Sequence, residues 1–215
     1  MKVYRDHYFK KAKQENYPAR SVYKLKEIDK RFHLFRPGMR VLDLGAAPGS
    51  WSLGAAEIIG PQGRVLGADL QTTQTRFPAN VTFMQEDVFE RSQAFEDALA
   101  AMSPLHIVMS DMAHNTTGHR FTDQARSAAL CREALAVAAR YLIHGGSFIV
   151  KIFMGPDFHE FAAEMRVHFT SVKTFKPKSS RAESKEIFYI GMGFKGGQEN
   201  ADDSAGHAAG PDADQ

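Results

Sequence analysis

Residues 41–52 read VLDLGAAPGSWS and have the composition of a ligand-binding loop. An apolar run containing Asp43 leads into the small residues GAAPG, whose side chains would not keep the backbone away from a ligand. The stretch lacks both the G-x-G-x-x-G spacing of dinucleotide-binding loops and the G-K-[ST] ending of a P-loop. A pyrophosphate is therefore not the expected ligand. A tight structural turn remains an alternative for the loop alone.

Two further acids narrow the choice of ligand. Asp69 ends the next predicted strand about 20 residues after the loop, where an acid binds ribose hydroxyls. Asp87, within QEDV after the third predicted strand, could accept a hydrogen bond from an exocyclic amine. Acids for ribose and adenine without a phosphate cradle predict adenosine that carries something other than phosphate. We expect S-adenosylmethionine (SAM) as cofactor and no metal site.

The elements that must position these residues alternate along the chain. Apolar runs predict strands at 40–44, 64–69, 81–84, 107–110, 147–153, 170–175 and 187–194. Helical patterns lie at 21–32, 52–59, 92–102, 122–142 and 158–168, the fourth of them closed by Gly145-Gly146. This order predicts an α/β, Rossmann-like fold with a mostly parallel seven-stranded sheet and helices on both faces. Ligands of such sheets bind beyond the carboxyl ends of the strands.

Charge and composition divide the chain of 215 residues into three parts. Residues 1–20 form a predicted basic arm, 21–196 one folded domain, and 197–215 a disordered acidic tail rich in glycine and alanine. Residues 1–40 hold twelve Lys/Arg against four Asp/Glu, with tyrosines interleaved. Such a surface suits nucleic acid, although a solvated helix face would look the same. The single cysteine and the lack of a membrane-length apolar run favour a cytoplasmic protein, which we expect to be a monomer.

Five segments resemble one family in order: ARSVYKLKEI, DLGAAPGSWS, SDMAHNTTG, VKIFMG and SRAESKEIFYIGMGF. From about Tyr17 to Phe194 the chain is similar to the FtsJ/RrmJ ribosomal RNA 2'-O-ribose methyltransferases. The resemblance implies a uridine of large-subunit (23S) ribosomal RNA as substrate, in the assembled large subunit. It implies a catalytic set of Lys24, Asp111, Lys151 (the proton acceptor) and Glu186. Cofactor contacts carry over to Gly49, Trp51, Asp69, Asp87 and Asp111.

The implied set suits the transfer of a methyl group to a ribose hydroxyl, which needs a base and in-line geometry. A free lysine amine is protonated at neutral pH, but burial or a nearby cation favours its neutral form. Lys151 ends the apolar run FIV, and Lys24 could supply the cation. Asp111 and Glu186 would oppose this effect and orient the amines. Alternatively, Lys151 only extends to solvent, and Glu186 only pairs with a neighbouring cation, Arg181 or Lys185.

Absent residues argue against other methylations. Methylation of a base nitrogen usually requires an aromatic residue in the loop that here reads DMAHN, and methylation of pyrimidine carbon five requires a cysteine nucleophile. The only cysteine, Cys131, lies within a predicted helix. Two residues depart from the family pattern: Ser50 stands where glycine is common, and His114 where proline is common.

The sequence also leaves other functions open. The same chemistry could act on tRNA or on a capped mRNA end, and the fold could belong to a non-catalytic RNA-binding factor in ribosome assembly. A dinucleotide oxidoreductase is disfavoured by the glycine spacing. The final loop adds a basic rim for RNA, formed by Lys173, Lys176, Lys178, Arg181 and Lys185.

Overall fold

The computed structural model describes residues 7–113, 118–181 and 184–196. Within these residues seven strands form one sheet in the order β3-β2-β1-β4-β5-β7-β6. Their bounds are β1 Arg40–Leu44, β2 Arg64–Asp69, β3 Val81–Gln85, β4 Leu105–Ser110, β5 Leu142–Phe153, β6 Phe169–Phe175 and β7 Glu186–Phe194. The pairs from β3 to β5 are parallel, whereas β7 runs antiparallel to both β5 and β6. The predicted fold class is confirmed; the predicted tail lies outside the described residues.

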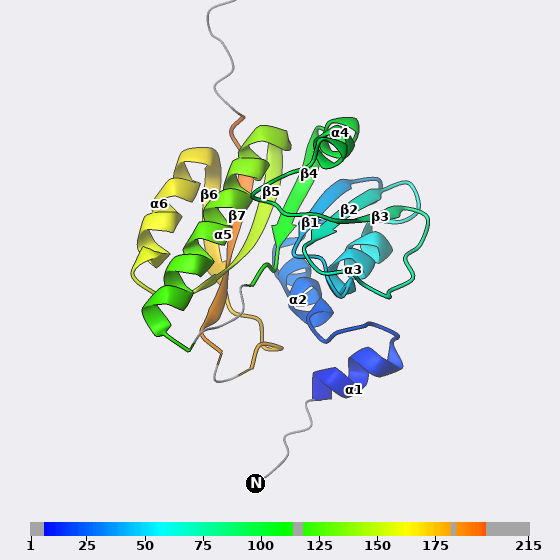
Figure 1. The fold of residues 1–215 in the computed structure, drawn as a ribbon, viewed down its shortest axis with the longest axis horizontal. Coiled ribbons are helices and arrows are strands. Elements are labelled where there is room, and N and C mark those ends of the chain that lie inside the picture. Colours follow the sequence, from blue (N-terminus) through cyan, green and yellow to red (C-terminus); the bar gives the residue numbers. More distant parts are fainter. Residues whose placement is uncertain (1–6, 114–117, 182–183, 197–215) are drawn as a thin grey trace, which may run out of the picture.

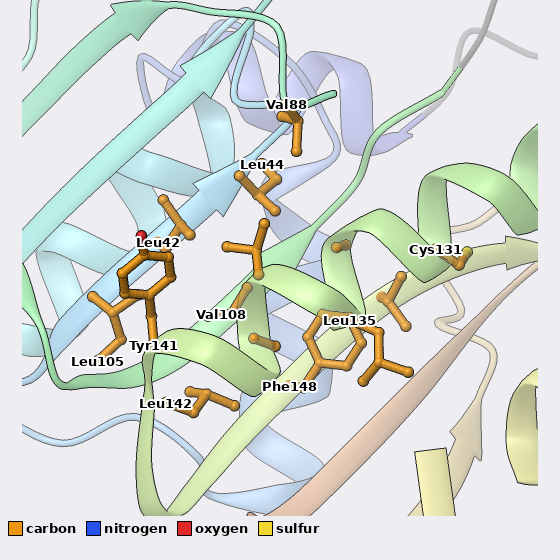
Figure 2. Packing of buried hydrophobic residues seen from close by; sticks show 14 of the residues in the cluster. Leu42, Leu44, Val88, Leu105, Val108, Cys131, Leu135, Tyr141, Leu142 and Phe148 are labelled. Atoms are coloured by element: carbon orange, nitrogen blue, oxygen red, sulfur yellow. The ribbon is translucent and has the colours of Figure 1, made fainter. Parts of the chain in front are cut away.

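Helices cover both faces of the sheet (Figure 1). They are α1 His7–Gln14, α2 Val22–Phe32, α3 Ser50–Ile59, α4 Gln93–Met102, α5 Arg120–Tyr141 and α6 Asp157–His168. Side chains of α2 and α3 share one apolar cluster with Ile149 and Phe188 of the sheet. Side chains of α4, α5 and α6 share the other cluster with Leu42 and Phe148. Figure 2 shows part of this second cluster, with Leu135 and Tyr141 of α5 directed toward the strands. The two cores hold the strand ends in place.

The N-terminal helix α1 joins the domain through a small cluster of its own. Ala12 of α1 is buried together with Val22 and Tyr23 of α2, and Tyr8 and Tyr17 pack against them. The predicted arm is therefore partly helical and lies against α2, the helix that carries Lys24.

The boundary between α5 and β5 differs from the prediction. The helix ends at Tyr141, and Leu142 already pairs with Leu105 as the first residue of β5. The register then shifts before Ser147 pairs with Ile107, and Gly145 takes a positive φ of 79° within the irregular stretch. The glycines thus bend a strand instead of ending a helix, because Leu142 is buried in the sheet at once.

Candidate active site

The small-residue loop follows β1 and closes tightly on its neighbours. Gly45 has φ +80°, and a Cβ there would lie 2.7 Å from the Cα of Met112. Gly49 has φ +111°, and a Cβ there would lie 2.7 Å from the ring of Phe77. Both positions therefore require glycine for two reasons, a left-handed backbone and the lack of space for a side chain. The two glycines therefore let the main chain of this loop pack closely against Met112 and Phe77 at the carboxyl end of β1.

Asp69 at the end of β2 holds this loop. One carboxylate oxygen accepts the N–H of Ala47 at 2.9 Å, and the other accepts the N–H of Gln71 at 2.8 Å. Each oxygen retains a lone pair for a further donor. Asp69 thus fixes the loop and can still accept a hydroxyl of a ligand.

A recess of about 90 Å³ lies beside this loop. Asp69, Asp87 and Gly45 line it together with apolar side chains, those of Leu70, Val88, Phe89, Met112 and Leu130 among them. Leu70 and Phe89 are large apolar residues that are 64% and 53% exposed. Acids beside apolar side chains suit the ribose and the base of adenosine. Because typical ligand clefts measure roughly 300–1,000 Å³, this recess can hold one end of such a cofactor.

Two more of the predicted cofactor contacts, Gly49 and Trp51, lie at the start of α3. Gly49 precedes the first turn of α3, and Trp51 is buried within that turn. The indole N–H of Trp51 donates to the carbonyl of Ser21 at 2.9 Å, and its ring packs on Phe188. Neither residue is among those that line the recess. Trp51 thereby joins the start of α3 to the start of α2 and to β7.

Ser50, at the position where glycine is common, is buried and has a partner. Its hydroxyl accepts the N–H of Ala19 at 2.7 Å. This contact joins the start of α3 to the residues that precede α2. His114, the second departure, lies outside the described residues.

Lys151 and Asp111 form the first of two ion pairs in the candidate active site. Asp111 directly follows β4, and Lys151 lies near the end of the neighbouring strand β5 with 8% of its surface exposed. The Lys151 amine lies 2.7 Å from Oδ1 of Asp111 and donates to the Asp111 main-chain carbonyl at 2.6 Å. Oδ1 itself forms no aligned hydrogen bond, so its contact with the amine is chiefly electrostatic.

Lys24 and Glu186 form the second pair. The Lys24 amine of α2 lies 2.6 Å from Oε1 of Glu186 at the start of β7, and both side chains are largely buried. Glu186 therefore pairs with Lys24, which is distant in sequence, and not only with a neighbouring cation such as Lys185.

Phe188 brings the two pairs together. It is the cross-strand partner of Lys151 in the pairing of β5 with β7, and the Lys24 amine lies 5.8 Å from its ring centre. Glu186 pairs with Phe153, two residues beyond Lys151 on the same strand face. All four residues implied by the resemblance therefore lie around one point at the carboxyl ends of β4 and β5.

Asp43 is a functional candidate that the sequence did not single out beyond its strand-end position. It is fully buried in β1 and accepts the hydroxyl of Ser52 at 2.6 Å, while its other oxygen has no hydrogen-bond partner among the described residues. Burial raises the pKa of Asp43 to about 7; the Ser52 bond opposes this, and the charges of Asp111 and Asp69 add to it. The sequence around Asp43 could not predict this pKa, because the groups that set it come from other elements of the fold.

Comparisons with known proteins point to one family. A family model described as FtsJ-like methyltransferase matches residues 17–194. A ribosomal RNA large subunit methyltransferase E of Nitratidesulfovibrio vulgaris is 74% identical over 196 residues, which cover 91% of this chain and 98% of that protein. The protein of the same name from Lawsonia intracellularis is 62% identical over 195 residues, again with 91% and 98% coverage.

A solved structure extends the likeness to three dimensions. It is that of a Plasmodium falciparum protein described as a ribosomal RNA methyltransferase, with a TM-score of 0.73 and 25% identity. The match covers 84% of this chain and all of that one. Among the described residues no helix has the length and apolarity that crossing a membrane would require. The matched family model spans most of the chain, and the chain belongs to the FtsJ-like methyltransferase family.

Proposed function

We propose that this methyltransferase uses SAM to methylate the ribose 2'-hydroxyl of a uridine in 23S ribosomal RNA, in the large subunit. The observation that carries the proposal is the convergence of Lys24–Glu186 and Lys151–Asp111 around Phe188. The small-residue loop and its recess, which adjoin Asp69 and Met112, lie at the same sheet edge. Relatives named ribosomal RNA large subunit methyltransferase E supply the substrate class.

The two lysines have different roles in this proposal. Lys151, in its neutral form, accepts the proton of the ribose hydroxyl at its Nζ. Asp111 orients that amine through two oxygens, its carboxylate and its main-chain carbonyl. Lys24 and Glu186 hold the ribose from the α2 side. When bound, SAM supplies the methyl electrophile, and Asp69 and Asp87 hold its adenosine.

The proposal also covers the surfaces that bind RNA, the oligomeric state and the location of the enzyme. The arm and the loop before β7 contact RNA phosphates, which contribute affinity and register more than sequence recognition. We propose that the enzyme acts as a monomer in the cytoplasm, on ribosomal subunits.

Methyl transfer to large subunits that lack the modification tests the function. We expect ribose-linked label from labelled SAM with the wild type and a loss of about 10²–10⁴-fold for Lys151→Ala, the usual contribution of a general base. SAM binding by calorimetry should persist in this variant. The control is Lys195→Ala, because the Lys195 amine donates to the main-chain carbonyls of Arg166 and Val167 at the other end of β7. Undiminished transfer by Lys151→Ala would contradict the mechanism.

Two further results would favour the other functions. Faster transfer to free tRNA than to subunits would indicate a different RNA substrate. Failure of the wild type to bind SAM would favour a non-catalytic RNA-binding factor.

A further inference from the structure

A groove of about 610 Å³ lies between α1, α2 and the end of β6. Its lining includes five cations, Lys11, Lys26, Lys30, Arg31 and Lys178, and two acids, Glu15 and Glu27. Glu15 is already engaged, because it accepts the Tyr23 hydroxyl at 3.0 Å and lies 3.7 Å from the Lys11 amine. The groove therefore presents a net positive charge to a ligand.

Glu27 is also engaged, by main-chain atoms that are distant in sequence. Its Oε2 accepts the N–H of Lys178 at 2.6 Å, and its Oε1 accepts the N–H of Ser179 at 2.9 Å. Two consecutive N–H groups on one carboxylate form a charge-assisted clamp. The clamp holds the described part of the loop after β6, residues 176–181, against α2. We call these residues the basic loop.

The same helix contacts this chain segment at a second point. Lys24 precedes Glu27 by one helical turn and pairs with Glu186, where β7 begins. The Lys176 amine donates to the carbonyl of Ser184 at 2.8 Å and so joins the basic loop to the residues just before β7. Among the described residues, the buried hydroxyls of Ser179 and Ser180 have no hydrogen-bond partner, whereas the main-chain N–H groups of Lys178 and Ser179 are both bonded to Glu27.

We propose that Glu27 is a positioning residue: it clamps the basic loop onto α2 so that Lys178 completes the cationic groove for the RNA strand that flanks the target nucleotide. The inference rests on the proposed function for its RNA ligand, whereas the clamp itself can be tested without methyl transfer. In the structure Lys178 lines the groove, and its own N–H is bonded to Glu27.

Trypsin provides the first test, because the peptide bond after Lys178 lies between the two clamped N–H groups. Cleavage there requires the loop to open. Glu27→Gln retains one acceptor oxygen and Glu27→Ala retains none, so we expect faster cleavage in that order, on the order of tenfold for each bond lost. The control is Glu160→Gln on α6, whose side chain is 68% exposed; it should be cleaved at the wild-type rate.

Steady-state kinetics with large subunits provide the second test. We expect both Glu27 variants to raise KM for the subunit more than they lower kcat, with unchanged affinity for SAM. A merely structural role would lower the melting temperature without this split. Unchanged cleavage after Lys178 in both variants would overturn the clamp, and unchanged KM in a variant with an open loop would overturn its role in RNA binding.

If Glu27→Ala does not fold, Glu27→Gln supplies both the cleavage rate and the KM for the subunit. If the wild type transfers no methyl group, the proposed function fails, while the cleavage rates still decide the clamp.

Discussion

Each buried lysine of the candidate active site has a carboxylate partner of its own. Lys24 lies beside Glu186, and Lys151 lies beside Asp111, so neither amine is an uncompensated charge in the interior. Removing a single member would leave its partner buried and unpaired. Substitutions at this site therefore combine a chemical loss with a structural one, and the two must be measured separately.

Asp43 gives a pH-dependent prediction at the same scale. Burial raises its pKa to about 7, whereas an aspartate in an unfolded chain has a pKa of about 3.9. Between these values the folded state binds a proton that the unfolded state does not. The free energy of unfolding should therefore fall as pH rises through this window, by up to about 1.4 kcal/mol per unit, and stay lower above it.

The variant Asp43→Asn remains neutral at every pH and should lack this slope. Urea unfolding at several pH values between about 4 and 8 measures it. Relative to the wild type, Asp43→Asn should gain stability steadily across the window. The control, Asp97→Asn on the exposed side of α4, should keep the wild-type slope. Parallel curves for Asp43→Asn and the wild type would show that Asp43 is ionised throughout.

At the scale of elements, the sequence could predict the positions of the strands but not the order in which all of them pair. The apolar runs of β1, β2 and β4 are bounded by acids and glycines, so their positions and shared edge could be inferred. The insertion of β7 between β5 and β6 could not, because both orders leave the same faces apolar. That insertion makes Phe188 the partner of Lys151 and brings Glu186 within reach of Lys24. From the sequence, only the family resemblance connects these side chains.

The small-residue loop provides an element-scale prediction with a matched control. Gly45 and Gly38 have nearly equal φ values of +80° and +81°, but a Cβ at Gly38 would meet nothing within 4 Å. Both alanine variants should lose about 1–2 kcal/mol of stability through backbone strain. Only Gly45→Ala also collides with the main chain of Met112, so it should lose more stability and bind SAM more weakly. Denaturant unfolding and calorimetry measure both effects; equal behaviour of the two variants would contradict this account.

At the scale of the whole molecule, a net charge of only +2 conceals a strong separation of charge. The cations gather on α1, α2 and the basic loop, around the groove next to Lys24. This gathering could be anticipated for residues 1–40 from composition. The part contributed by Lys178 could not, because it depends on a contact between Glu27 and a loop 151 residues later.

Salt dependence should reveal this charge distribution. The logarithm of affinity for large subunits should fall linearly with the logarithm of salt concentration, because RNA binding releases counterions. Lys30→Gln and Lys178→Gln should each weaken binding and reduce the slope by roughly one. Lys195→Gln, beyond the groove, should leave the slope unchanged. Slopes that do not change in the groove variants would locate the RNA elsewhere.

The hydroxyl of Ser50 and the indole of Trp51 both bind the chain just before α2, at Ala19 and Ser21. The first turn of the helix behind the nucleoside pocket is thereby bonded to the segment that leads from the arm to Lys24. If binding of the proposed methyl donor tightens these contacts, it also orders the surface that we propose for RNA, and linkage of this kind is reciprocal. Large subunits bound to that surface would then raise the affinity for the donor by the same factor by which the donor raises affinity for them.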